Sequence, residues 1–321
     1  MPTLDSTLLE IIRRRSSVRT FDGTPPEAGK LALLRELLAQ LERGPFGRRC
    51  RFALLDMSGF DAKQLKQYGT YGLITGTRFF LAGAVEDGPG NLEDFGYLLE
   101  TAVLACTGME LGTCWLGGVL NRSTFGRELA LEAGELIPAV TPVGRAADHR
   151  SFKDKALRFM AGSAKRKPWR ELFFDGVWGR PFEEERALDG KAASGLREAF
   201  EAVRRAPSAS NKQPWRVVWQ EGAAHFYLER SSVYSKIMEL AKMPALQRTD
   251  LGIAMAHFDL AARALGREGA WTFDPPGISG VPGSAVFVAS WRAGGASNLT
   301  APAALATLLI RFAESTAGAA R

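Results

Sequence analysis

Asp94–Trp115 reads DFGYLLETAVLACTGMELGTCW and Asp250–Trp271 reads DLGIAMAHFDLAARALGREGAW, and these two stretches decide the fold. Each is mostly apolar and too long for a strand, which predicts a long buried helix. They align without a gap at one constant offset. The identical pairs are Asp94/Asp250, Gly96/Gly252, Leu104/Leu260, Ala105/Ala261 and Trp115/Trp271.

A second ungapped match comes before the first in each copy. LRELLAQLERGP from Leu34 aligns with LREAFEAVRRAP from Leu196, with five identities in twelve positions. Apolar residues recur every three or four positions in both segments, which predicts a helix with one buried face. Two matching blocks in the same order indicate a duplicated unit.

Runs that are typical of β-strands occupy corresponding places in the two copies. They are Arg51–Asp56, Arg78–Val85 and Ile137–Val143 in the first copy and Trp215–Gln220, Ala224–Glu229 and Ala285–Trp291 in the second. Each copy thus reads helix, strands, long helix, strand, which predicts an α+β fold with a mostly antiparallel sheet covered by helices. We place the boundary so that residues 1–167 and 168–321 form two tandem halves.

The composition is that of a soluble globular protein, with 46% hydrophobic and 24% charged residues. Three cysteines without CxxC spacing or a nearby histidine pair argue against a disulfide framework and a metal site. The net charge of +6 is spread along the chain, so we expect no nucleic-acid partner. The apolar stretch 98–120 is interrupted by Glu100 and Glu110, so we expect no membrane span. Without a secretory pattern at its start, the sequence predicts a cytoplasmic location.

The segment RRRSSVRTF, Arg13–Phe21, follows a short predicted helix. Arg15, Ser17 and Arg19 alternate along it, so in an extended chain they would share one edge. Forked guanidinium donors together with a hydroxyl suit a phosphate group. Arginines at this place also complement the negative end of the helix dipole, and the pattern by itself leaves both interpretations open.

The segment APSASNKQPW, Ala206–Trp215, follows the first helix of the second copy. By composition it is a helix stop and a turn. Together with Arg13–Phe21 it resembles the signature of the nitroreductase family, in which RRSxRxF and APSxxNxQPW flank the first core helix. In this chain the two parts lie in different copies. The first copy has the shorter GPFGRRC from Gly44 in place of the loop, and the second has only Gly179–Phe182 in place of the arginine segment.

Two further segments are similar to the same family. In GTCWLGG, Gly112–Gly118, the resemblance implies that the backbone amide of Gly117 donates to flavin N5, whereas the segment alone would be a helix end followed by a strand. KRKPWREL, from Lys165, resembles the basic tail that completes the family's phosphate site. The resemblance makes Lys165 and Lys167 candidates, with Arg166 turned away; a solvated charged linker is the alternative.

The resemblance implies one FMN site, because the parts that survive in the two copies complement each other while the parts of the mirror-related site are lost. The two halves would form an intramolecular pseudo-dimer, so one chain can work as a monomer. The implied cofactor-binding residues are Arg15, Ser16, Ser17, Arg19, Trp115, Leu116, Gly117, Gly118, Lys165 and Lys167 from the first half and Pro207, Ser208, Ala209 and Asn211 from the second.

The implied activity is that of an oxidoreductase in which NAD(P)H reduces FMN and a nitroaromatic, a quinone or another small metabolite then oxidises it, in a ping-pong sequence. This chemistry needs no protein nucleophile, and we assign no catalytic acid or base. Tyr68, Tyr71 and Arg78 are candidates for the open face of the flavin. A flavin-binding sensor or carrier without turnover, and a specialised reaction such as dehalogenation or dehydrogenation, remain alternatives.

Overall fold

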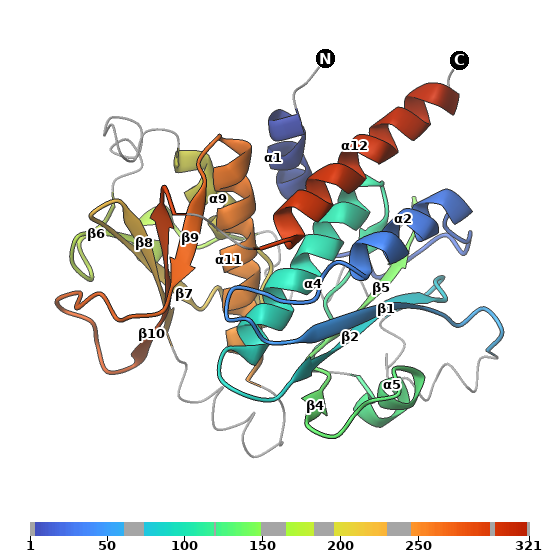
Figure 1. Ribbon diagram of the computed structural model, residues 1–321, viewed down its shortest axis with the longest axis horizontal. Helices are drawn as coiled ribbons and strands as arrows, with labels where there is room; N and C mark the ends of the chain where they lie inside the picture. The colour runs from blue at the N-terminus through green and yellow to red at the C-terminus, as the bar shows by residue number, and fades with distance from the viewer. Residues whose placement is uncertain are drawn as a thin grey trace. The chain divides into compact units, whose positions relative to one another are not determined.

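The chain forms two compact units in a computed structural model (Figure 1). Unit 1 comprises Met1–Arg13 and Ala164–Asn298, and unit 2 comprises Arg14–Ser163 and Leu299–Arg321. The N-terminal helix therefore belongs with the second half of the sequence and the C-terminal helix with the first, so no single cut of the chain separates the units. The structure describes residues 4–60, 74–118, 120–148, 165–182, 196–229, 245–295 and 299–319.

Unit 2 contains a five-stranded sheet in the order β1-β2-β5-β3, with β4 also paired to β2. All of its ladders are antiparallel. Its elements are α2 (Ala28–Leu38), β1 (Cys50–Asp56), β2 (Phe79–Glu86), α4 (Asn91–Gly108), β3 (Gly112–Thr113), α5 (Arg122–Glu128), β4 (Glu135–Leu136), β5 (Val140–Gly144) and α12 (Ala301–Ala319).

The core of unit 2 forms around its central strand and its longest helix. The strand β2, FFLAGAVE, is buried along nearly its whole length, and α4 is buried from Asn91 to Cys106. A continuous apolar run fits a strand or helix that is covered on every side. The C-terminal helix α12 packs against α4 and α2, and the Thr300 hydroxyl, just before α12, donates to the carbonyl oxygen of Gln40 at 3.1 Å.

Unit 1 contains a five-stranded sheet in the order β6-β7-β8-β10-β9. Only β6 is parallel to its neighbour; the other ladders are antiparallel. Its elements are α1 (Leu4–Arg14, whose last residue counts with unit 2), α7 (Trp169–Leu172), β6 (Phe173–Asp175), α9 (Arg197–Arg205), η1 (Ala209–Asn211), β7 (Trp215–Gln220), β8 (Ala223–Glu229), α11 (Leu246–Ala264), β9 (Gly269–Thr272) and β10 (Ala285–Ala293).

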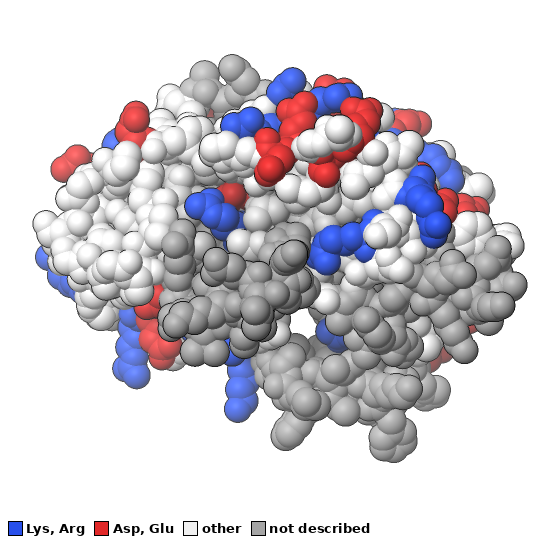
Figure 2. Space-filling view, turned by 90° about the horizontal axis from the view of Figure 1, so that it is seen from below, with Lys and Arg blue, Asp and Glu red and all other residues white. Residues whose placement is uncertain are grey.

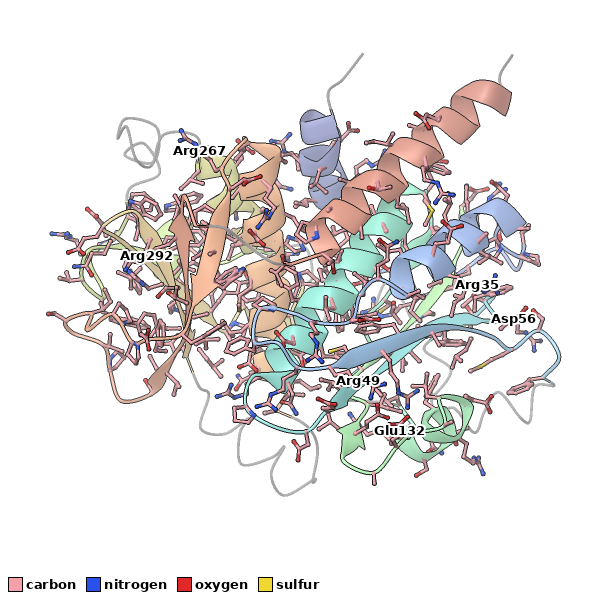
Figure 3. All side chains as sticks on the ribbon, viewed as in Figure 1. Arg35, Arg49, Asp56, Glu132, Arg267 and Arg292 are labelled. Atoms are coloured by element: carbon pink, nitrogen blue, oxygen red, sulfur yellow. The ribbon has the colours of Figure 1, made fainter. Side chains whose placement is uncertain are left out.

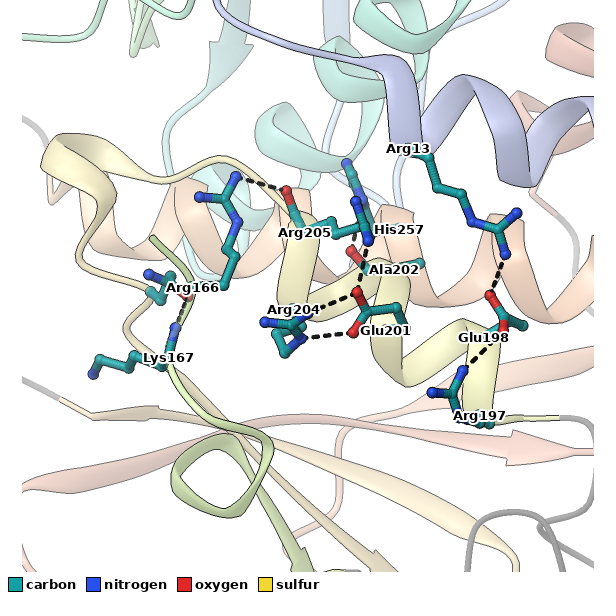
Figure 4. A network of polar contacts seen from close by, with 11 residues as sticks. Arg13, Arg166, Lys167, Arg197, Glu198, Glu201, Ala202, Arg204, Arg205 and His257 are labelled. Atoms are coloured by element: carbon teal, nitrogen blue, oxygen red, sulfur yellow. Dashed lines mark hydrogen bonds and ion pairs between the residues drawn. The ribbon is translucent and has the colours of Figure 1, made fainter. Parts of the chain in front are cut away.

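Aromatic rings fill the core of unit 1. The ring of Phe200, on α9, lies 5.2 Å from that of Phe173 and 5.3 Å from those of Phe182 and Phe258, measured between centroids. All three pairs have the edge-to-face geometry that aromatic quadrupoles favour. On the polar side of α9, Arg13 of α1 pairs with Glu198 at 2.5 Å (Figure 4), which ties α1 to this unit.

The two sheets repeat one plan. The path β1-β2-β5-β3 in unit 2 has the same chain order and pairing as β7-β8-β10-β9 in unit 1. The predicted α+β class, with helices over mostly antiparallel sheets, is confirmed. The strand predicted at Ile137–Val143 in fact begins at Val140, as β5, and the residues before it connect β5 to the short β4. Pro138, which has no N–H to donate, lies in this connection.

Charged side chains lie mainly on the outside. On the face drawn in Figure 2, acidic side chains gather near the upper edge, with basic side chains beside them. No helix among the described residues is long and apolar enough to cross a membrane, and these residues contain no cluster of three or more metal-ligand side chains. The charged residues labelled in Figure 3 are all exposed: Arg35, Arg49, Asp56, Glu132, Arg267 and Arg292.

Candidate functional site

The arginine segment of unit 2 is extended, as predicted. Ser17 forms a bridge with Thr113 of β3, and the N–H of Val18 donates to the carbonyl oxygen of Thr113 at 2.8 Å. Further along, Phe21 bridges Ala146, and its ring is buried in the core of the unit. The segment from Arg15 to Arg19 is thereby fixed beside β3, which forms the first two residues of GTCWLGG and leads into the turn at Gly117 and Gly118.

A buried carboxylate connects the arginine segment to that turn. Glu100, on α4, is fully buried and accepts a hydrogen bond of 2.7 Å from Nε1 of Trp115. Its other carboxylate oxygen lies 3.9 Å from Nε of Arg15, whose side chain is only 6% exposed. Within the described part of the chain, Nε of Arg15 has no hydrogen-bond partner. A buried cation with an unused donor is suited to receive an anionic ligand.

The turn after β3 presents two free backbone donors. Leu116 exchanges hydrogen bonds of 2.9 and 3.0 Å with Val140 of β5, so its N–H and its carbonyl oxygen are both used. The next two amides, of Gly117 and Gly118, donate to no group among the described residues. Gly117 is half-buried and Gly118 exposed. Two adjacent free N–H groups are available to donate to the acceptor edge of a ligand or to water.

The loop that follows α9 in unit 1 is held in an unusual backbone conformation. Ser210, Asn211 and Gln213 have φ values of 51°, 54° and 48°, in the left-handed region that non-glycine residues rarely adopt. The Ser208 hydroxyl accepts from the N–H of Gln213 at 2.9 Å, and the N–H of Ala209 donates to Asp250 at 2.9 Å. Backbone strain of this kind concentrates at ligand sites, where the surrounding contacts compensate its cost.

The basic tail lies in unit 1, against this loop. Arg166 donates to Asn211 Oδ1 at 3.0 Å and to the carbonyl oxygen of Arg205 at 3.1 Å, so its guanidinium group lies against the loop. Figure 4 shows the contact with Arg205. Asn211 Nδ2 donates to the carbonyl oxygen of Lys165 at 2.8 Å, and the N–H of Lys167 donates to Gln213 at 2.9 Å. Burial, together with the nearby Arg216, lowers the pKa of Lys167.

The repeated aspartates perform the same task in both units. Asp94 accepts from the N–H groups of Phe46 and Arg48, each at 2.7 Å, and Asp250 accepts from Ala209. Each therefore fastens the loop after the preceding helix to the start of the long helix. Burial raises the pKa of Asp94 to about 7 and that of Asp250 to about 8.

In the second copy, Arg180 and Phe182 have local structural roles. Arg180 Nε donates to the carbonyl oxygen of Asp175 at 2.6 Å, and the ring of Phe182 packs on Phe200. Their persistence in the copy without a phosphate-binding serine is thereby explained by turn formation and core packing.

The sequence-predicted residues fall into two groups. Unit 2 holds Arg15, Ser16, Ser17, Arg19 and Trp115–Gly118, and unit 1 holds Lys165, Lys167, Pro207, Ser208, Ala209 and Asn211. Lys165 and Lys167, predicted to act with the first copy, are thus placed with the loop of the second. Tyr68 and Tyr71 lie outside the described residues, and Arg78 donates to the carbonyl oxygen of Phe60.

Three polar residues that support these segments were not among the predicted site residues: Glu100, Arg122 and Asp250. Arg122, at the start of α5, donates to the carbonyl oxygen of Gly117 at 2.6 Å. Asp250 was visible in the sequence as a repeated identity, and Glu100 as a charge in an apolar helix. Arg122 carried no comparable signal.

Comparisons with known proteins give one family. Residues 7–262 match the model of a family described as "Putative TM nitroreductase". Among solved structures, a "putative nitroreductase" from Thermotoga maritima is 19% identical, with a TM-score of 0.53 over 88% of this chain and 92% of that chain. This likeness, which extends over both units, shows the fold.

Two shorter structures also align. A "putative nitroreductase" in complex with FMN from Desulfovibrio desulfuricans is 22% identical over 55% of this chain and 98% of that chain, with a TM-score of 0.41. A nitroreductase family protein from Clostridium novyi NT is 19% identical over 55% of this chain and 96% of that chain, with a TM-score of 0.36. No curated protein matches the chain.

Proposed function

Since the chain belongs to this nitroreductase family, and is therefore an oxidoreductase, we propose that it binds one FMN and uses it to pass hydride from NAD(P)H to an electron-poor small molecule. The acceptor class is that of nitroaromatics, quinones or a metabolite of similar electron demand. When bound, FMN supplies the redox chemistry by accepting and releasing hydride at N5. The chain's own residues bind the cofactor and orient it.

The observation that carries this proposal is the turn at Gly117 and Gly118. Two neighbouring amide donors have no partner among the described residues, and glycine allows a flat ring to approach the backbone closely. We infer that Gly117 donates to flavin N5, with Gly118 as a second donor on the same edge of the ring. Trp115 and Leu116, which lead into the turn, are held by Glu100 and by Val140.

The phosphate group of FMN suits the arginine segment. Nε of Arg15 is buried and unused, and Ser16, Ser17 and Arg19 follow on the same extended segment. Charge-assisted hydrogen bonds from guanidinium groups to phosphate are among the stronger polar contacts in proteins. We propose that these residues bind the phosphate.

From the family resemblance alone, we propose that the loop of unit 1 also takes part in binding FMN. Pro207, Ser208 and Ala209 stand on a loop that Asp250 and Gln213 hold in place. Asn211 uses its side-chain amide for Lys165 and Arg166, so we assign it chiefly the shape of the loop. Lys165 and Lys167 supply positive charge next to it.

Anaerobic spectroscopy of the purified protein tests the proposal. We expect bound FMN to lose the visible absorption band of oxidised flavin when NADH or NADPH is added, and to regain it when a nitroaromatic or quinone is added. Steady-state rates should give parallel lines in double-reciprocal plots. Flavin that remains oxidised under an excess of both nicotinamides would refute the reductase assignment and favour a sensor or carrier. A protein without flavin affinity would refute the cofactor assignment itself.

A further inference from the structure

Arg122 holds the carbonyl side of the glycine turn. Its Nη2 donates to the carbonyl oxygen of Gly117 at 2.6 Å and to that of Pro138 at 3.2 Å, and its Nε donates to that of Ile137 at 3.1 Å. One guanidinium group thus joins the turn to the segment that connects β4 with β5. A lysine could not reproduce this pattern, because its donors radiate from a single nitrogen.

Because Arg122 holds the Gly117 carbonyl group, it also fixes the direction of the Gly118 N–H. A trans peptide is planar, so the N–H of Gly118 points opposite to the carbonyl oxygen of Gly117. The carbonyl oxygen of Leu116 is held by Val140 in the same way, which directs the N–H of Gly117 away from β5. Both free donors of the turn are therefore oriented by contacts on the opposite side of their peptide planes.

The turn needs such a hold because of its sequence. Two successive glycines give the backbone the widest choice of conformations, including those in which the Gly117–Gly118 peptide is flipped. A flipped peptide would present a carbonyl oxygen where the N–H now points, and two acceptors would then face each other. Among the described residues, Arg122 donates to backbone carbonyl oxygens alone, so the guanidinium group serves the backbone and not a carboxylate.

We propose that Arg122 is a positioning residue for the flavin, which holds the Gly117 carbonyl group and so keeps the free N–H groups of Gly117 and Gly118 turned toward the N5 edge of the ring. The inference rests on the proposed function. It assigns a role to a residue that lies outside every motif that identifies the site.

Paired titrations with FMN and 5-deaza-FMN test this role in the full-length apoprotein. The two ligands share the phosphate and the ring shape, but the deaza compound has C–H in place of the N5 acceptor. We expect Arg122→Met to lower the affinity for FMN about five- to tenfold, the equivalent of one lost hydrogen bond. Its effect on the affinity for 5-deaza-FMN should be much smaller. Arg122→Lys should lie between Arg122→Met and the wild type.

Arg51→Met is the control, because Arg51 also donates to backbone carbonyl oxygens, those of Leu129 at 2.6 Å and Ala130 at 3.0 Å, but not to the turn; unlike Arg122, it also pairs with a carboxylate, that of Glu135. It should leave the ratio of the two affinities unchanged. If Arg122→Met weakens both ligands equally or neither, or if the wild type binds both ligands equally, the positioning role is wrong. If Arg122→Met does not fold, the same comparison applies to Arg122→Lys. A wild type that binds neither flavin refutes the proposed function instead.

Discussion

Trp115 donates its indole N–H to Glu100 at 2.7 Å, whereas Trp271, at the equivalent position of the second copy, has a buried indole N–H without a partner among the described residues. The residue equivalent to Glu100 in the second copy is Ala256. The same tryptophan is therefore satisfied in one unit and unsatisfied in the other.

This difference predicts that the same substitution has unequal effects on stability in the two units. Trp115→Phe should destabilise the protein by about 2 kcal/mol, because a hydrogen bond to a charged group is lost and Glu100 stays buried. Trp271→Phe should change the free energy of unfolding by less than about 1 kcal/mol, since it also removes an unsatisfied donor. Urea unfolding of both variants measures the difference, and equal losses would contradict the prediction.

Glu100→Gln isolates the charge beside Arg15. The 3.9 Å separation of Arg15 Nε and Glu100 Oε1 is too long for a hydrogen bond, so this contact acts through charge. Glutamine can still accept from Trp115, but the negative charge that opposes a phosphate is removed. We expect FMN to bind about five- to tenfold more tightly at low salt. The affinity for riboflavin, which has no phosphate, should not change; a parallel gain for riboflavin would rule out the electrostatic explanation.

Arg15→Ala and Arg180→Ala compare the retained and the lost arginine segments. A charge-assisted hydrogen bond contributes roughly 1.5 to 3 kcal/mol, so Arg15→Ala should weaken FMN about tenfold or more. Arg180 is 57% exposed and pairs with Asp175 in a local turn, so Arg180→Ala should leave the affinity for FMN unchanged. Fluorescence titration with FMN measures both, and similar losses would refute the asymmetric assignment.

Asp250 makes stability depend on pH. Its pKa is raised from 3.8 in the unfolded chain to about 8 in the folded protein by burial, against the opposing hydrogen bond from Ala209; no charged neighbour contributes. Between these values the unfolded state loses the proton first, so the free energy of unfolding falls as the pH rises from about 4 to about 8. The stabilising contribution is fully present below the lower value.

Asp250→Asn cannot ionise and keeps an acceptor for Ala209. Its stability relative to the wild type should therefore increase from pH 5 to pH 8, by an amount on the order of a few kcal/mol. Asp94 titrates in both proteins and cancels in the comparison. Urea unfolding across this pH range provides the test, and a difference that does not vary with pH would show that Asp250 is ionised in the folded state throughout.

Flavin stoichiometry tests the proposal that only one composite site survives. FMN released by heat should approach one mole per mole of chain, and light scattering should allow a mass near 34.9 kDa. Two flavins per chain would mean that the second copy has kept its site. An obligatory dimer that loses its flavin on dissociation would place the cofactor between chains.

The sequence predicted the bounds of single strands better than the contacts between segments that are distant in sequence. β7 lies at its predicted bounds, because its two tryptophans and two valines favour a buried strand locally. The short β6, just after the boundary predicted between residues 167 and 168, was not predicted, since Phe173–Asp175 becomes a strand by pairing with β7, which is distant in sequence. The contact of Arg122 with Gly117 likewise depends on the path of the turn and on α5, which no local pattern specifies.

Each terminal helix belongs to the unit that is formed mainly by the other half of the sequence, and this matters if the two halves are expressed separately. Met1–Arg13 completes unit 1 and Leu299–Arg321 completes unit 2, although each is encoded with the opposite repeat. Two polypeptides expressed from a gene split at residue 164 would each lack a helix of their own core and carry one that fits the other fragment. Such fragments would depend on complementation in trans. The segments of the two units alternate along the chain, so no circular permutation makes either unit contiguous, whereas an exchange of the two terminal helices would make both contiguous.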